Sequence, residues 1–575
     1  MFLFLFALGS LFCEPTVAQQ RVDLPWVELR GDHSAGERFL AIRPDGVAAL
    51  MGLERVELPG FPLSDGSQAT LELQRIRLDK LELGLYVDGE SAPGLLGGLD
   101  LSVWRGKVMG EDASDVALAF SQQGLNGWVR AHGALHHLMS SGGGSVRLVS
   151  EARLLALGAP SGFSCASDGL TDNAAQVREL ESSAANTFQA NFAGSPPLYG
   201  CPIAIETDYQ LNQIFGGNLQ AETAYIVSLL AWASYRFEEQ IGTVLTYPYL
   251  QFYTTPNDPW YTQDAGGNCI DLVYEFQAAW LGNIPNGAQL AHFLSGANLG
   301  CGAAFIGGLC DLTRNFGVTG NMDGNNVFPI QVGPSNFNFY GVCHEIGHNF
   351  DAIHTHDYCP PIDECAPPGY FGPCQTQKVC TTQGTLMSYC HGCPGGFQNI
   401  TTYFHPQSVA DMRAWVESTC LGLQCADPTP YCVPLTSSQG CVPAIGWSGH
   451  PTLSGLDDFH LIADAIPGQT MGVLYWGLDR NPPTPFGGGT QLWSDSWLGT
   501  TLCVSRPQRE LLMPSGGVSG TCTGSFDFDF SHAFMAGKGL LAGTHVYAQF
   551  FYLDPANQGA SGVGHTDALE FVICP

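Results

Sequence analysis

The chain has 575 residues, of which 45% are hydrophobic and 13% charged, so it is too long for one ordinary domain and too apolar to be disordered. Its formal charge is −31, from 53 acidic and 22 basic residues. So acidic a surface repels phosphate backbones and anionic membranes, which argues against nucleic acid as a partner.

Residues 1–18 contain the apolar run FLFLFALGSLF, followed by the small residues of Thr16-Val17-Ala18. This pattern predicts a secretory signal peptide, and the run is too short to anchor the chain in a membrane. No second segment of about 20 apolar residues follows, so we predict a secreted, extracellular protein without a transmembrane anchor. Twenty cysteines then indicate a set of disulfides. Cys13 leaves with the signal peptide, and 19 cysteines imply that one stays unpaired.

Residues 19–195 are predicted to form a β-rich N-terminal domain. Short alternating runs such as Thr70–Arg77 and Asp115–Phe120 are typical of strands, and Cys165 is the only cysteine here. The polar, small-residue stretch Glu181–Pro197 follows, and it is either a surface loop or a joint between domains. The sharp rise in cysteine density after it favours the joint.

Residues 196–422 are predicted to form an α/β domain. Pro202–Glu206 and Val244–Tyr253 are strand candidates, and Leu272–Trp280 is a helix candidate. A long amphipathic helix is predicted over Leu219–Gln240 because apolar residues recur there at helical spacing, at Ile226, Leu230, Ala233, Phe237 and Ile241. Alternating strands and helices indicate a mixed, mostly parallel sheet.

The last part of the chain is predicted to hold two small units. Residues 423–443 are a Cys-rich linker, where we expect a disulfide knot among the four nearby cysteines Cys420, Cys425, Cys432 and Cys441. Residues 444–575 are rich in Gly, Pro, Ser and aromatic residues, and Thr544–Tyr552 alternates as a strand does. We therefore expect an antiparallel β-sandwich braced by two or three cysteines.

The stretch Phe339–His356 reads FYGVCHEIGHNFDAIHTH and carries the strongest functional signal. On a helix, His344 and His348 project from one face, and two imidazoles at about 2.0–2.1 Å suit zinc. A catalytic zinc needs a third ligand, for which His354 is our candidate and His356 the rival.

Glu345 follows the first histidine, so on a helix it points beside the metal rather than at it. In that position it can take a proton from zinc-activated water and pass it to the leaving amine, as a general base and then a general acid. The expected reaction is therefore hydrolysis of a peptide bond.

These residues resemble the HExxHxxGxxH signature of metzincins, and HEIGHNF resembles the adamalysin or reprolysin (ADAM-type) group in a bacterial-style secreted form. The resemblance implies a protease with one catalytic Zn²⁺ that cleaves proteins or peptides. It also implies a methionine in a tight turn beneath the metal, for which Met387 in GTLMSY is the match. The family glycine after the helix is Asp351 here, and aspartate tolerates the left-handed conformation at some cost.

The resemblance extends beyond the zinc motif. GAAFIGGLC, residues 302–310, looks like the family's substrate-pairing edge strand, with Ala303, Ala304, Phe305 and Ile306 in contact with substrate. SDVAL and GLNGWV, from residues 114 and 124, resemble a reprolysin pro-domain, which makes residues 19–195 a propeptide of a zymogen. Cys165 then resembles the propeptide cysteine whose thiolate blocks zinc, although it could instead pair across domains. The family pattern also suggests that Cys310 pairs with Cys420.

Three readings stay open at this stage. Calcium could be bound by Asn321–Asn326, but this segment lacks the spacing of an EF-hand loop, and a plain turn is preferred. The CHGC of residues 390–393 reads as disulfide-forming rather than as half a structural zinc site. The main alternative to a protease is an adhesive or binding protein that uses the C-terminal sandwich, and a third reading is hydrolysis of a non-peptide amide. The intact Glu345 favours the protease, which we expect to be a monomer.

Overall fold

A computed structural model describes most of the chain, in a β-rich, multi-sheet architecture with few helices. The predicted signal peptide, the stretch 181–197 and part of Asn321–Asn326 lie outside the described residues. Two compact units divide the chain, one over residues 18–422 and one that begins at Leu423. The structure describes residues 20–29, 36–140, 143–157, 163–170, 198–324, 337–366, 374–424, 427–454, 456–480, 490–491, 501–557 and 562–575.

The N-terminal segment (residues 20–170) contains a large sheet with the strand order β1-β4-β5-β8-β9-β10-β11-β12-β3-β2. The neighbouring strands are antiparallel except for β1 and β4, and the two strands predicted at residues 70–77 and 115–120 are confirmed as β5 and β9. Alternating residues of these strands fill one core beneath the sheet. The bounds are β1 Gln20–Arg21, β2 Trp26–Glu28, β3 Glu37–Ile42, α1 Pro44–Leu50, β4 Arg55–Pro62, β5 Gln68–Ile76, η1 Leu78–Leu81, β8 Ser102–Val108, β9 Glu111–Ser121, β10 Gly124–Ala131, β11 Ala134–Met139, β12 Ser145–Ser150 and α2 Glu151–Ala156.

The central segment (residues 198–422) contributes the middle of a second sheet, with the order β13-β17-β18-β16-β14-β15-β6-β7. Its pairs are parallel except β17 with β18 and β6 with β7, which confirms the predicted mixed, mostly parallel sheet. The N-terminal segment supplies the outer strands β6, β7 and β13. The bounds are β6 Leu85–Val87, β7 Glu90–Ser91, β13 Ser164–Cys165, β14 Tyr199–Thr207, β15 Thr243–Phe252, β16 Leu290–Leu294, β17 Cys301–Ala304 and β18 Phe316–Thr319.

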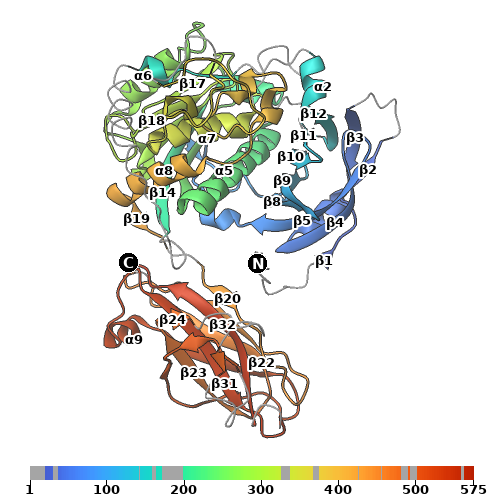
Figure 1. Cartoon of the computed structure of the whole chain (residues 1–575), viewed down its shortest axis with the longest axis vertical. Helices are drawn as coiled ribbons and strands as arrows, with labels where there is room; N and C mark the ends of the chain where they lie inside the picture. The colour runs from blue at the N-terminus through green and yellow to red at the C-terminus, as the bar shows by residue number, and fades with distance from the viewer. Residues whose placement is uncertain are drawn as a thin grey trace, which may run out of the picture. The chain divides into compact units, whose positions relative to one another are not determined.

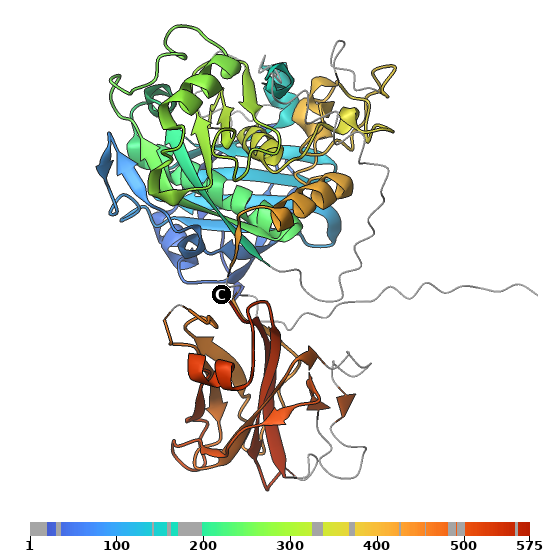
Figure 2. The same ribbon diagram turned by 90° about the vertical axis from the view of Figure 1, so that its left-hand side faces the viewer.

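The long helix α5 (Leu219–Ile241) starts at the predicted residue and is buried on nearly all its faces, unlike an ordinary amphipathic helix. The reason is visible in Figure 1 and Figure 2, where the blue N-terminal strands lie against the green helix of the central segment. Strand β15 of the central sheet packs on α5, as do β8 and β9 of the N-terminal sheet. The other helices are α4 Tyr209–Ile214, α6 Cys269–Trp280, η3 Pro285–Gly287, α7 Asn338–Asn349, η4 Thr355–Asp357, η5 Cys390–Gly392, η6 Gly396–Asn399 and α8 Pro406–Ser418.

The C-terminal unit (residues 423–575) has two main sheets that share one hydrophobic core. One has the order β20-β32-β31-β23-β28 with β29 beside β23, and the other has the order β21-β22-β30. The strand predicted at residues 544–552 is β31. The bounds are β19 Gly422–Leu423 at the boundary of the units, β20 Thr429–Tyr431, β21 Ala444–Ser448, β22 His460–Ile466, β23 Met471–Gly477, β24 Asp479–Arg480, β25 Thr490–Gln491, β26 Thr501–Leu502, β27 Val504–Ser505, β28 Gln508–Arg509, β29 Met513–Pro514, β30 Gly524–Asp529, α9 His532–Gly537, β31 His545–Leu553 and β32 Val563–Val572.

The disulfides correct two predictions. The expected knot is wrong, because Cys420 pairs with Cys310, as the family pattern suggested, and Cys432 and Cys441 pair with Cys503 and Cys522 of the C-terminal unit. The expectation of one free cysteine is wrong as well. Among the described residues Cys201 and Cys343 are free and buried in the apolar core beside α5, in addition to Cys165. Both cysteines of CHGC form disulfides. Further pairs between described residues are Cys269–Cys301, Cys359–Cys374, Cys365–Cys390 and Cys380–Cys393, and Cys574 is also disulfide-bonded. Cys425 of the expected knot lies outside the described residues.

Among the described residues, no helix combines the length and the hydropathy that a membrane span requires.

Candidate metal centre

Helix α7 places two imidazoles side by side in the interior of the first unit. His344 and His348 are both fully buried, and their ring centroids lie 4.8 Å apart. Nδ1 of His344 lies 2.7 Å from the carbonyl oxygen of Leu386, and Nδ1 of His348 lies 2.7 Å from that of Ala352. A carbonyl oxygen only accepts, so both Nδ1 atoms donate, which leaves the Nε2 lone pairs free to bind a metal.

The chain turns sharply after α7 and returns a third histidine to the same point. Asp351 makes the turn with a φ of +75°, so aspartate takes the left-handed conformation expected at the glycine position. Nε2 of His354 then lies 3.2 Å from Nε2 of His348. The rival ligand His356 stacks on His354 with ring centroids 5.1 Å apart, and it lies outside the group formed by His344, His348, His354 and Cys165.

This donor set fits a zinc ion. The four potential ligand atoms lie within 4.8 Å of one another. Nε2 of His344 is buried and has no hydrogen-bond partner among the described residues. Two nitrogens that bind one tetrahedral zinc at about 2.0–2.1 Å are separated by about 3.3 Å. The 3.2 Å between His348 and His354 matches that value, and a cation removes the repulsion between two facing lone pairs.

Met387 packs against helix α7 at Gly347, which lies between the two helical histidines in sequence. A Cβ built at Gly347, inside α7, would lie 2.9 Å from its sulfur atom, so only glycine lets the helix approach the methionine this closely. The carbonyl oxygen of Met387 accepts a hydrogen bond of 3.1 Å from the backbone of Thr355. Together with the contact between His344 and Leu386, this bond holds the turn against both histidine-bearing segments.

Cys165 reaches the same point from the N-terminal segment. Its strand β13 pairs in parallel with β17, beside the metal-binding group. The Cys165 sulfur lies 3.3 Å from Nε2 of His348 and 3.7 Å from Oε2 of Glu345. Burial raises the pKa of this thiol to about 12. No disulfide involves it, so the open alternative of a pairing across domains does not hold.

Glu345 is fully buried and faces the N-terminal segment across this group. Burial raises the pKa of its carboxyl group to about 8. Its Oε2 accepts a hydrogen bond of 3.3 Å from the hydroxyl of Ser167, which itself accepts one of 2.9 Å from the backbone of Ala304. Ser167 therefore links Glu345 to strand β17 of the central sheet.

The four residues predicted to contact substrate divide into two pairs. Ala303 and Ala304 lie in β17, whereas Phe305 and Ile306 follow the end of that strand. The reason is that the backbone leaves β17 to contact α7, where the side-chain amide of Asn349 donates a hydrogen bond of 3.0 Å to the carbonyl of Phe305. In this structure β13 pairs with the free side of β17, so β13 and not β17 is the outermost strand at this end of the sheet.

Three residues that the sequence analysis did not single out also surround the histidines. Ser167 and Asp168 belong to η2 (Ser167–Gly169), and the Asp168 carboxylate lies 3.4 Å from Nδ1 of His354. Burial lowers the pKa of His354, but the charges of Asp168 and Cys165 and the hydrogen bonds with Asp168 and Asp357 together outweigh burial and raise that pKa well above its usual value. Tyr389 donates a hydrogen bond of 3.1 Å to the carbonyl of Cys165. The polar run SCASD around Cys165 was the available signal for the first two.

The comparison with known proteins agrees with this geometry. Residues 198–404 match the family model Reprolysin_5, described as metallo-peptidase family M12. Residues 198–404 are therefore similar to the reprolysin-type metallopeptidases of family M12. Members of this family are typically zinc-dependent, and as peptidases they act on proteins or peptides. No curated protein matches the chain.

The M12 match covers α7, the three histidines and Met387, but ends before α8. It leaves out the N-terminal segment, including Cys165, and the whole C-terminal unit. The contacts that these parts make are therefore features of this chain that the family match does not describe.

Proposed function

We propose that this protein is a secreted zinc metalloendopeptidase that is made as a latent zymogen. The observation that carries the proposal is the convergence of the His344, His348 and His354 imidazoles beside a buried Glu345, within a segment that matches family M12. These three histidines would hold one zinc ion, and Met387 packs against the helix that carries two of them. The seven disulfides among the described residues support an oxidising, extracellular location.

Bound zinc supplies a Lewis acid and lowers the pKa of water at the site. Glu345 moves the proton: its carboxylate takes it from the attacking water, holds it on an Oε atom and delivers it to the leaving amine. Burial favours the protonated carboxyl, which suits a group that must hold a proton near neutral pH. Ala303 and Ala304 of β17 offer backbone groups to an extended peptide, which is the mode of strand addition.

In the zymogen, the Cys165 thiolate would bind the zinc together with the three histidines. Its sulfur already lies 3.3 Å from a ligand nitrogen, and β13 takes the place on β17 that an extended substrate needs. Residues 19–195 are the propeptide in this proposal, and residues 196–422 are the catalytic domain. Residues 423–443 lead into an accessory β-sandwich of residues 444–575, and the active protein is a monomer.

The test compares wild type with Glu345→Gln after removal of residues 1–197, and measures bound zinc and the cleavage of casein. We expect one zinc per chain in both proteins and cleavage by wild type alone. The loss of cleavage should reach at least about 100-fold, because proton transfer by a positioned side chain contributes about 10²–10⁴-fold.

The control is Glu417→Gln, in which an exposed carboxylate of α8 is changed in the same way. It should bind zinc and cleave casein as wild type does. Zinc in both proteins with no cleavage by wild type would favour a binding protein, and the absence of zinc would eliminate the site.

A further inference from the structure

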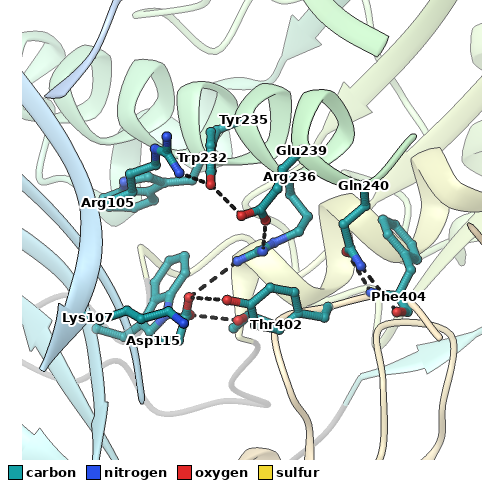
Figure 3. A network of polar contacts seen from close by, with 12 residues as sticks. Arg105, Lys107, Asp115, Trp232, Tyr235, Arg236, Glu239, Gln240, Thr402 and Phe404 are labelled. Carbon is teal, nitrogen blue, oxygen red and sulfur yellow. Dashed lines mark hydrogen bonds and ion pairs between the residues drawn. The ribbon is translucent and has the colours of Figure 1, made fainter. Parts of the chain in front are cut away.

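The N-terminal segment contacts the central segment at places other than the metal centre, and one of them is a buried polar cluster (Figure 3). Asp115 projects from β9, and its carboxylate meets Arg236 of α5 and Thr402 of the loop before α8. Asp115 is 7% exposed and Arg236 is 4% exposed. A buried charge that loses its partner is strongly unfavourable, so this cluster depends on both segments being present.

The hydrogen bonds of Asp115 come from both sides of the interface. One carboxylate oxygen accepts a hydrogen bond of 2.6 Å from the Thr402 hydroxyl. The same oxygen accepts one of 2.7 Å from the indole N–H of Trp128, which belongs to the N-terminal segment itself. The other oxygen lies 3.3 Å from the Arg236 guanidinium and accepts a hydrogen bond of 3.4 Å from the Tyr403 hydroxyl. Three donors from the central segment thus converge on one carboxylate of the N-terminal segment.

The same tryptophan inserts into the hydrophobic interior of the central segment. Trp128 is 1% exposed, and its ring centroid lies 5.0 Å from Trp232 of α5 and 4.7 Å from Phe339 of α7. Aromatic rings at these separations stabilise an interface by more than the burial of their apolar area alone would give. Phe339 lies five residues before His344 on the same helix, so Trp128 packs on the helix that carries the metal ligands.

A third contact is made at the far edge of the central sheet. Strand β6 of the N-terminal segment pairs in parallel with β15, from Leu85 with Leu250 to Val87 with Phe252. The backbone of Leu250 also donates a hydrogen bond of 2.7 Å to Gly84. The N-terminal segment therefore occupies both edges of the sheet, through β13 at one and β6 at the other.

We infer that the central segment carries a permanent docking surface for the N-terminal segment, centred on Arg236, Thr402, Trp232 and Phe339, which retains that segment after the connection between them has been cut. Cleavage within residues 171–197 leaves every one of these contacts intact. The cut protein therefore stays latent, and activation requires a second event that unfolds or degrades the N-terminal segment. That the retained segment keeps a protease inactive rests on the proposed function. That the segment stays bound after the cut does not.

The experiment uses the full-length chain with the recognition sequence of a site-specific protease inserted after Ser183, in the Glu345→Gln background to prevent self-cleavage. After the cut, the two pieces are diluted to about 10 nM and separated by size-exclusion chromatography. We expect them to co-elute, and a fluorescent peptide hydroxamate, which binds an accessible zinc site, should not bind the cut complex. Separation of the wild-type pieces at this concentration would overturn the inference.

Two substitutions localise the retention. Asp115→Ala should raise the dissociation constant of the pieces at least about 100-fold, because it leaves Arg236 buried without this partner. Asp79→Ala is the matched control, since Asp79 is an exposed aspartate that forms an ion pair with Arg77 in the same segment. Cys165→Ala should leave the pieces together. An unchanged affinity in Asp115→Ala would overturn the role of the cluster.

If Asp115→Ala does not fold, a milder variant of the other segment tests the role of the cluster. Thr402→Val removes one hydrogen bond from the Asp115 carboxylate and keeps the side-chain volume. It should weaken the complex about 10-fold, and no change would again overturn the role of the cluster. Co-elution does not depend on the proteolytic activity of this protein itself, so its outcome and that of the casein test are independent.

Discussion

Asp351 determines the direction in which the chain leaves the metal-binding helix. Its φ of +75° lies in the left-handed region, which costs an ordinary L-residue roughly 1–2 kcal/mol. Aspartate is one of the few residues other than glycine that visit this region, because its short polar side chain bonds locally. The departure from the family pattern thus preserves the turn that brings His354 back to His348.

We predict that Asp351→Ala destabilises the first unit by about 1 kcal/mol, whereas Asp351→Gly changes its stability by less than about 0.5 kcal/mol. The free energy of unfolding in urea checks this. Asp112→Ala, at an exposed position of β9, is the control and should behave as wild type. Equal losses of stability in Asp351→Ala and Asp351→Gly would show that the left-handed backbone conformation does not determine which residue is tolerated at position 351.

At the level of elements, the close approach of β17 to α7 fixes where Glu345 points. A Cβ built at Gly302 would lie 2.7 Å from both Cγ and Cδ of Glu345, which is closer than real Cβ contacts come. The strand that we propose to pair with a substrate therefore also confines the proposed general base. No other residue type leaves room for both functions at residue 302.

We predict that Gly302→Ala displaces the Glu345 side chain and lowers the rate of casein cleavage at least about 10-fold, with the zinc content unchanged. The reason is that a misplacement of about 1 Å is enough to reduce catalysis by orders of magnitude. Gly392→Ala is the matched control, because nothing lies within 4 Å of the added carbon. Full activity of Gly302→Ala would mean that Glu345 does not depend on this contact.

At the level of the whole molecule, the two units have separate hydrophobic cores. The C-terminal unit fills its interior from its own two sheets, and the first unit has a core shared by the N-terminal and central segments. The disulfide Cys441–Cys522 lies entirely within the C-terminal unit and closes a loop with a sequence separation of 81. Each unit should therefore unfold on its own.

Calorimetry of the Glu345→Gln protein should show two transitions. The double variant Cys441→Ser, Cys522→Ser should lower only the transition of the C-terminal unit, by about 4 kcal/mol of stability from the loop that is no longer closed. The transition of the first unit should not move. A single cooperative transition, or a shift of both, would contradict the independence of the units.

The sequence by itself determined the local features of this protein. The spacing of His344 and His348 on one helix, two strands of each sheet and the long helix predicted over residues 219–240 follow from periodicities that need no distant contact. The pairing of Cys310 with Cys420 followed only from the family resemblance, because cysteine spacing alone fixes no connectivity.

Only the tertiary structure decided what depends on residues far apart in the chain. The burial of α5 on nearly all faces and the failure of the expected cysteine knot both arise from partners more than 70 residues away. The same holds for Asp168 beside His354 and for the cluster around Asp115, whose donors come from α5 and the loop before α8. Sequence periodicity predicts the local conformation of a segment and which of its faces is buried. It does not predict the partner of a buried charge, because that partner comes from a distant part of the chain that the tertiary structure brings close.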